Sequence, residues 1–199
     1  HARDYAGLFQ QAFGGPVTMR RVGQALAQYE RTLISGDSRF DRWLYANEPL
    51  ALNSSETLGY QLFTGKGGCS SCHLIQKDHA LFTDQQAHNT GIGYWDSMLR
   101  PSREVAVQLA PGITAKIDQA RIASVGGAKA NDVGLYEVTL NPGDRWKYRT
   151  PGLRNVALTA PYMHNGELLT LEAVVDFYNR GGINNELLSS LLKPLDLTP

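Results

Sequence analysis

Cysteine is scarce in this chain, and several other features are missing with it. Only two cysteines occur among 199 residues, three positions apart, which excludes a scaffold of several disulfides such as small secreted proteins use. Nineteen basic residues balance nineteen acidic ones, so no net field favours nucleic acid or an anionic membrane. No apolar run approaches the roughly 18 residues that a membrane span requires.

A recognisable secretion signal is also missing, and the chain begins at His1 rather than at methionine. We therefore expect a processed or partial product, whose location has to be inferred from its chemistry. Apolar residues make up 42% of the chain and aromatic residues 9%, which is enough for a core and argues against disorder. The length fits one domain.

Helical periodicity of apolar residues is strong at both ends of the chain and weak between them. The predicted helical segments are 4–13, about 18–33, from the N-cap candidates 53–56 to Gly65, from the N-cap Thr170 to Gly181, and a short turn at 185–192. Residues 78–154 are rich in Gly, Pro, Asn and Asp, and only 135–140 looks like a strand. Because about 75 residues of plain loop would be abnormal in a compact domain, we expect ordered loops wrapped over a cofactor.

Residues 68–73, Gly-Cys-Ser-Ser-Cys-His, contain a C-x-x-C-H motif. Such a motif attaches haem covalently, since the thiols of Cys69 and Cys72 add across the vinyl groups and the spacing places His73 on the iron. A zinc site would need a second pair of ligands, and no further cysteine exists. A thioredoxin-like pair would need a βαβ context, which the periodicity does not show. We predict one c-type haem, attached outside the cytosol, in the bacterial periplasm or its equivalent.

The sixth coordination position of such an iron can hold Met, His, Tyr or nothing, and the choice shapes the function. Met163 or Met98 would give an ordinary electron carrier, whereas Met19 lies on the apolar stripe of an early helix and fits packing. Tyr178 ends the apolar face of the 171–180 helix, where a core tyrosine bonded to backbone is the commoner interpretation. A tyrosinate ligand would instead favour high oxidation states of iron.

Three histidines lie in loops rich in Asn, Asp or Gly, namely His79, His88 and His164. On sequence alone, each fits a structural role or a contact with a haem propionate better than a role as iron ligand. The axial assignments therefore depend on His73 and on the choice between Tyr178 and a methionine.

Beyond the haem motif, distinctive blocks cover nearly the whole chain, at residues 8–14, 25–35, 38–42, 82–84, 88–91, 150–166 and 170–182. The two longest read TPGLRNVALTAPYMHNG and TLEAVVDFYNRGG. With these blocks the chain resembles the C-terminal haem domain of the bacterial dihaem cytochrome c peroxidase/MauG family. We accordingly expect a mainly α-helical, cytochrome c-like fold with long ordered loops and at most a small β-hairpin, as a single haem domain over residues 1–199.

The resemblance implies roles for individual residues. Tyr178 holds the position of the sixth iron ligand, where ordinary peroxidases of the family have Met and MauG-like members have Tyr, and Met163 then becomes a packing residue. The backbone carbonyls of Thr159 and Pro161 match ligands of a calcium ion between two haems, and carbonyl oxygens suit this hard cation. The other matching positions in the haem surroundings are Arg154, His164 and His88.

One feature departs from the family pattern, because family members carry two haem motifs and this chain has one. The resemblance therefore implies an N-terminal haem domain outside this chain, in its precursor or in a separate haem chain, with the peroxide-reactive haem. This chain would relay electrons or store oxidising equivalents for that haem, as part of a peroxidase/MauG-like oxidoreductase. Its partner would be a small cytochrome c or cupredoxin, or a protein substrate, and a homodimer would suit the family. The alternative is a monohaem electron-transfer cytochrome without catalytic activity.

Overall fold

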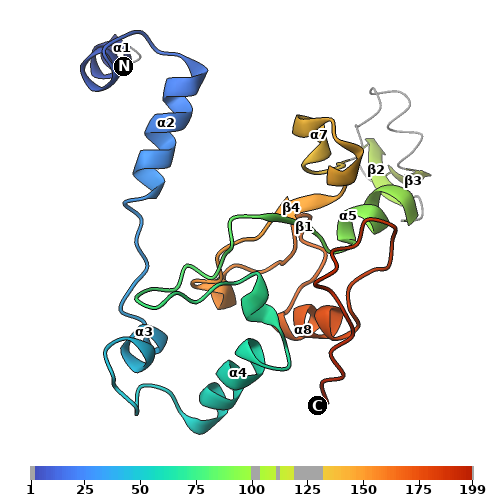
Figure 1. Ribbon diagram of the computed structural model, residues 1–199. Coiled ribbons are helices and arrows are strands. Elements are labelled where there is room, and N and C mark those ends of the chain that lie inside the picture. Colours follow the sequence, from blue (N-terminus) through green and yellow to red (C-terminus); the bar gives the residue numbers. More distant parts are fainter. Residues whose placement is uncertain (1–2, 100–103, 111–112, 119–131, 199) are drawn as a thin grey trace. The chain divides into compact units, whose positions relative to one another are not determined.

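The structure is a computed structural model that describes residues 3–99, 104–110, 113–118 and 132–198. Contacts divide the chain into two compact units, His1–Ala51 and Leu52–Pro199 (Figure 1). None of the described helices combines the length and the hydropathy that a membrane span requires. The prediction of a single haem domain over residues 1–199 stays a prediction.

The first unit is helical. It contains α1 (Arg3–Phe13), α2 (Met19–Glu30) and α3 (Arg39–Leu44). The first two were predicted, although α2 ends three residues early because the chain after Glu30 forms tight turns, with Thr32 N–H donating to Tyr29 O at 2.9 Å. The short α3 was not predicted, and it begins with a reciprocal cap in which Ser38 and Asp41 bond each other's backbone N–H.

The second unit begins and ends its regular structure with the two helices that the sequence predicts. In α4 (Ser54–Thr64), Asn53 Oδ1 accepts from Glu56 N–H at 2.9 Å and Glu56 Oε2 accepts from Asn53 N–H at 2.8 Å. In α8 (Leu171–Asn179), the side chain of Thr170 accepts from Ala173 N–H at 3.1 Å. The predicted caps are therefore confirmed, and they fix where both helices start.

Short strands and helical turns lie within the long loops between these helices (Figure 1). Strand β1 (Ala87–Asn89) pairs antiparallel with β4 (Lys147–Arg149), and β2 (Glu104–Ala110) forms a hairpin with β3 (Ile113–Asp118). The helical turns are η1 (Cys69–Ser71), α5 (Ile92–Tyr94), η2 (Trp95–Leu99), α7 (Tyr136–Thr139), η3 (Pro142–Asp144) and η4 (Val156–Leu158). The mainly α fold is confirmed, although the described residues form two small strand pairs, β1–β4 and β2–β3, where at most one hairpin was expected.

The strand predicted at 135–140 is wrong, because this segment contains the helical turn α7. Leu140 N–H donates to Tyr136 O at 2.9 Å, and the Glu137 carboxylate accepts from Val133 N–H at 3.0 Å. Local capping thus outweighs the β propensity of its side chains. The predicted helical turn at 185–192 consists of two separate turns, closed by Leu188 N–H and Leu192 N–H.

Asn89 fastens the tail of the chain to β1. Its side chain is buried, with the residue 1% exposed, and its amide donates to Asn185 Oδ1 at 2.9 Å while its Oδ1 accepts from Gly91 N–H at 2.8 Å. Its backbone carbonyl accepts from Ser189 N–H at 3.0 Å. Gly91 has a φ of +91°, and a side chain there would overlap the carbonyl of Ile183. The segment after α8 is therefore held against the strand pair.

Replacing Asn89 with Ala should lower the free energy of unfolding by about 2 kcal/mol, because it leaves the buried N–H of Gly91 without an acceptor and removes the hydrogen bond to Asn185 Oδ1. Urea unfolding followed by circular dichroism would measure the loss. The exposed Asn184→Ala is the matched control and should change stability by less than about 0.5 kcal/mol. Equal stability of the two variants would show that the tail does not depend on Asn89.

Candidate haem-binding site

The C-x-x-C-H motif folds as the tight turn η1, directly after α4. Gly68 opens the turn at a φ of +61°, and the backbone N–H groups of Cys72 and His73 donate to the carbonyl of Cys69 at 3.3 and 2.9 Å. Both cysteines are free thiols and half-buried, and burial raises the pKa of each. A side chain at Gly67 would lie 2.7 Å from the carbonyl of Leu62. The turn thus holds two unpaired thiols and an imidazole within five residues of one compact loop, at positions 69, 72 and 73.

His73 is oriented by a backbone carbonyl. Its Nδ1 lies 2.8 Å from Phe82 O, and since a carbonyl only accepts, Nδ1 carries the proton. Burial lowers the pKa of the imidazole, more than the neighbouring carbonyls of Phe82 and Pro151 raise it. A neutral ring protonated at Nδ1 is the form that binds a metal through Nε2. The orientation and the neutral form of His73 therefore fit an axial iron ligand.

Arg154 and Thr83 hold the segment that orients His73. Arg154 Nε donates to Ala80 O at 2.8 Å, and its guanidinium lies over the ring of Phe82 at 5.7 Å. Thr83, 8% exposed, donates from Oγ1 to Thr150 O at 2.7 Å. Arg154 was predicted for the haem surroundings. In the structure it contacts Ala80 and Phe82, and the carbonyl of Phe82 is the one that orients His73.

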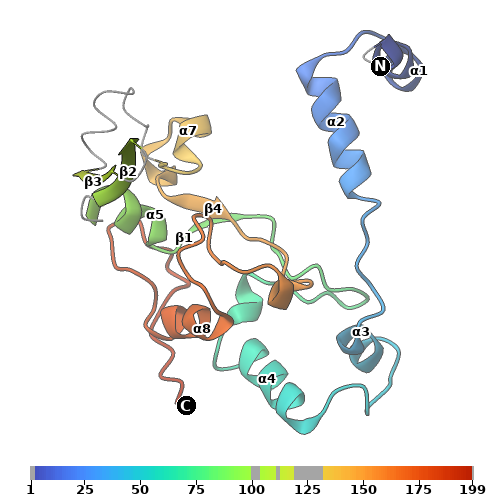
Figure 2. The ribbon, with the colours of Figure 1, turned by 180° about the vertical axis from the view of Figure 1, so that it is seen from behind.

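Tyr178 approaches the motif from α8, which lies beside η1 in both views of the molecule (Figures 1 and 2). Burial raises the pKa of its phenol to about 12, and negative charge on Cys72 and Cys69 would raise it as well, which reflects how near the three side chains lie. Its ring packs edge-on against Phe177 at 5.3 Å. Within the described part of the chain its hydroxyl makes no hydrogen bond, unlike the backbone-bonded core tyrosine that periodicity alone favours.

The three methionines are weaker candidates than Tyr178 for the sixth iron ligand. Met98 is 62% exposed, and Met19 is 85% exposed, so the packing expected for Met19 is not found within its unit. Met163 is half-buried at a φ of +69° in the loop before α8. Of the exposed loop histidines, His79 bonds its neighbour Asp78 at 2.7 Å.

Sequence reasoning missed Asp84, which lies beside the attachment site with His88. His88 Nε2 and Asp84 Oδ2 are 2.7 Å apart, and one ligand atom each of Asp84, His88 and Cys72 lie within 4.8 Å of one another. Burial raises the pKa of Asp84, but hydrogen bonds from His88 and the Gln86 N–H outweigh it and the pKa is lowered overall. Thiolate, imidazole and carboxylate would also suit a zinc-like ion, but that ion and haem attachment would compete for one sulfur. The sequence signal that could have indicated this pair is the spacing of four residues between Asp84 and His88.

His164 is engaged with a second tyrosine. Its ring stacks on Tyr148 with centroids 3.6 Å apart and an angle of 10°, and Tyr148 Oη donates to Asp132 Oδ1 at 3.1 Å. Strand pairing sets Tyr148 opposite His88, so two of the predicted surrounding residues belong to one layer of side chains. Burial lowers the pKa of His164, although Asp132 and Asp96 act in the other direction.

Thr159 and Pro161, the expected calcium ligands, follow η4 on an exposed loop. Thr159 donates from its backbone N–H and its hydroxyl to Val156 O, at 3.2 and 3.1 Å. In the described part of the chain, neither the Thr159 nor the Pro161 carbonyl accepts a hydrogen bond, so both oxygens are available to a cation. Their role stays a prediction.

Comparisons with known proteins agree with the family resemblance seen in the sequence. A family model described as di-haem cytochrome c peroxidase matches residues 1–49. The chain is 39% identical to cytochrome-c peroxidase IdrP1 of Pseudomonas sp. (strain SCT), over 98% of this chain and 50% of the relative. It is 34% identical to the methylamine utilization protein MauG of Methylorubrum extorquens, over 98% of this chain and 45% of the relative.

Among solved structures, a MauG-like protein associated with microbial copper homeostasis is similar over 98% of this chain and 54% of that chain. The identity is 30% and the TM-score 0.59. The chain spans about half the length of the curated relatives it matches.

Replacing His164 with Gln should flatten the dependence of stability on pH. Because the pKa of His164 is lowered in the folded chain, its contribution is present above about pH 6.5 and is lost as the pH falls below that value. The wild type should therefore lose more unfolding free energy than the variant between about pH 7 and pH 5. Urea unfolding at both pH values would test this, and parallel losses would contradict a histidine held neutral.

Proposed function

The chain belongs to the dihaem cytochrome c peroxidase/MauG family, and on that basis we propose that it is the haem c redox part of such an oxidoreductase, with His73 and Tyr178 as axial ligands. When bound, haem c supplies one-electron chemistry at iron. The residues present fit that group: Cys69 and Cys72 are unpaired thiols, and His73 is fixed in the metal-binding tautomer.

The observation that carries the proposal is the phenol of Tyr178, which lies near both attachment thiols and has no hydrogen-bond partner among the described residues. A phenolate oxygen is a hard anionic donor and favours the oxidised states of iron over the reduced state. With this ligand the chain stores oxidising equivalents, whereas a neutral methionine sulfur would suit an electron carrier of high potential.

The remaining residues position and tune the ligands. The carbonyl of Phe82 accepts from His73 Nδ1, which makes the imidazole a stronger donor at Nε2. Asp84, whose pKa is lowered, keeps a carboxylate beside Cys72 and accepts from His88. This negative charge also disfavours reduction of a neighbouring cationic centre.

We further propose that the peroxide-reactive haem lies in the half of the protein outside this chain. One C-x-x-C-H motif and a match to about half of each relative support this division. A calcium ion held by the carbonyls of Thr159 and Pro161 would lie between the two haems, and electrons would come from a small donor protein or a protein substrate. Covalent haem attachment through free thiols supports a periplasmic location, and a homodimer suits the family.

Replacing Tyr178 with Met should raise the reduction potential by roughly 100 mV or more, because a neutral sulfur replaces an anionic oxygen. Tyr178→Phe should alter the ferric spectrum while the haem stays attached. Spectra of the ferric and dithionite-reduced native protein, with a potentiometric titration, would measure both changes.

The matched control is Tyr162→Phe, since Tyr162 Oη donates to Val156 O at 2.9 Å and is a backbone-bonded tyrosine. It should leave spectrum and potential unchanged. If Tyr178→Phe behaved like this control, Tyr178 would be only a core residue. A methionine charge-transfer band in the wild type would favour the carrier cytochrome instead.

Replacing Cys69 or Cys72 with Ala should weaken haem retention and stability together, because the described residues bury few apolar side chains, namely Ala80, Ile92, Trp146 and Phe177. We expect a loss on the order of 2 kcal/mol, as for other covalent cross-links in small domains. Haem staining after denaturing electrophoresis and thermal unfolding would follow the two effects. Ser70→Ala, inside the motif, is the control, and unchanged stability of the cysteine variants would contradict the coupling.

A further inference from the structure

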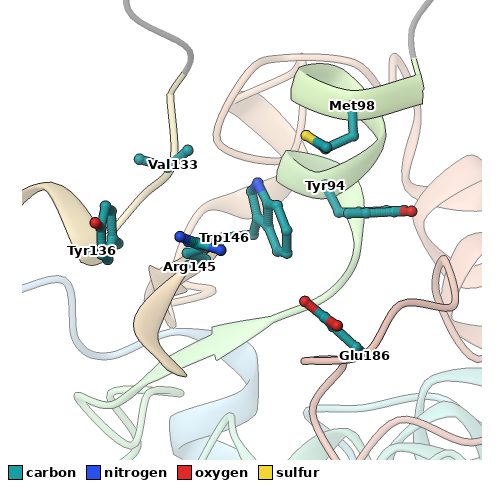
Figure 3. Close-up of a pocket in the computed structure, with 7 residues that line it drawn as sticks. All are labelled: Tyr94, Met98, Val133, Tyr136, Arg145, Trp146 and Glu186. Carbon is teal, nitrogen blue, oxygen red and sulfur yellow. The ribbon is translucent and has the colours of Figure 1, made fainter. Parts of the chain in front are cut away.

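A cavity of about 540 Å³ lies in the second unit, formed by residues other than those of the haem-binding site. The described residues that line it are Tyr94, Met98, Val133, Tyr136, Arg145, Trp146 and Glu186 (Figure 3). They come from α5, η2 and α7, from the residues just before α7 and just after η3, and from the tail after α8. A cavity of this volume suits a small organic ligand.

Aromatic rings form the apolar part of the lining. Trp146 is 5% exposed and meets Tyr94 edge to face, with centroids 5.0 Å apart. Its indole N–H is already bonded to Ser97 Oγ at 2.8 Å, so the ring offers π surface and no further donor. Tyr136 adds a third ring. These walls favour a planar aromatic ligand.

Two opposite charges supply the polar part. The Arg145 guanidinium lies 5.2 Å from the centre of the Tyr136 ring, and no carboxylate of the described chain pairs with it. Glu186 lies across the open space, with its carboxylate directed toward the aromatic side chains (Figure 3), and it too has no partner among the described residues. Since the two charges do not pair with each other, one cationic and one anionic group remain for a ligand.

We propose that this cavity binds a small aromatic carboxylate that also carries a hydroxyl group, of the hydroxybenzoate class. The rings contact the aromatic plane, and Arg145 donates a bidentate pair of hydrogen bonds to the ligand carboxylate. Glu186 accepts a hydrogen bond from the hydroxyl at the far end. The lining includes none of the proposed haem-binding residues, Cys69, Cys72, His73 and Tyr178. The ligand proposal is therefore independent of the proposed haem function.

Isothermal titration calorimetry on the purified native protein would test the ligand class. Para-hydroxybenzoate should bind saturably, and benzoate and para-cresol should each bind about tenfold more weakly, because each lacks one of the two polar contacts. Equal affinities for the three compounds, or no saturation by about 10 mM, would overturn the proposal.

Substitutions in the cavity locate the site. Arg145→Gln should weaken binding of para-hydroxybenzoate about tenfold and leave para-cresol unaffected, and Arg145→Lys should lie between. Glu186→Ala should bring para-hydroxybenzoate to the affinity of benzoate without changing benzoate itself. Arg20→Gln, at an exposed arginine of the first unit, is the matched control and should bind like the wild type. Unchanged binding by Arg145→Gln would place the ligand elsewhere, and the three-compound comparison stands even if that variant fails to fold.

Discussion

The hydrogen bond from His73 Nδ1 to the carbonyl of Phe82 is the contact on which the second unit's arrangement depends. It joins the turn that carries the thiols to a segment 9 residues later in the chain. That segment is in turn tied to residue 150, through Thr83 Oγ1 and Thr150 O, and so to the β1–β4 pair. Asn89 continues the sequence of bonds into the tail after α8. The carbonyl that specifies the tautomer of His73 is therefore connected through further hydrogen bonds to the strand pair and the tail of the unit.

Burial acts on every donor at the site in the direction of neutrality. It raises the pKa of both thiols and of the Tyr178 phenol, and it lowers the pKa of His73. Asp84 differs, because hydrogen bonds outweigh desolvation and keep its pKa low. The polypeptide alone therefore presents neutral donors beside one carboxylate. A phenolate at position 178 needs a neighbouring positive charge to offset its desolvation, which is what a metal centre provides.

What the sequence could predict was local, and what it could not was the meeting of distant backbone groups. Asn53 and Thr170 were readable as caps because a cap needs only the next three residues. The C-x-x-C-H motif is equally local in the sequence, and its role in haem attachment stays a prediction. The acceptor for His73 is a carbonyl, and every residue has one, so no side-chain pattern marks it. The segment 135–140 was mistaken for a strand because its β-prone side chains concealed a cap at Glu137.

Three tyrosines of the second unit show why the partnerless one matters most. Tyr162 bonds the Val156 carbonyl and Tyr148 bonds Asp132, so each recovers the hydrogen bond that it loses to water. Tyr178 does not, in the part of the chain that the structure describes. Withdrawing a hydroxyl from water without a partner costs about 1–3 kcal/mol, and phenylalanine would fill the same space without that cost. A tyrosine in this position is therefore stabilising only when its oxygen binds something, and the charged groups that would act on its pKa are the thiols of Cys72 and Cys69, the proposed sites of haem attachment.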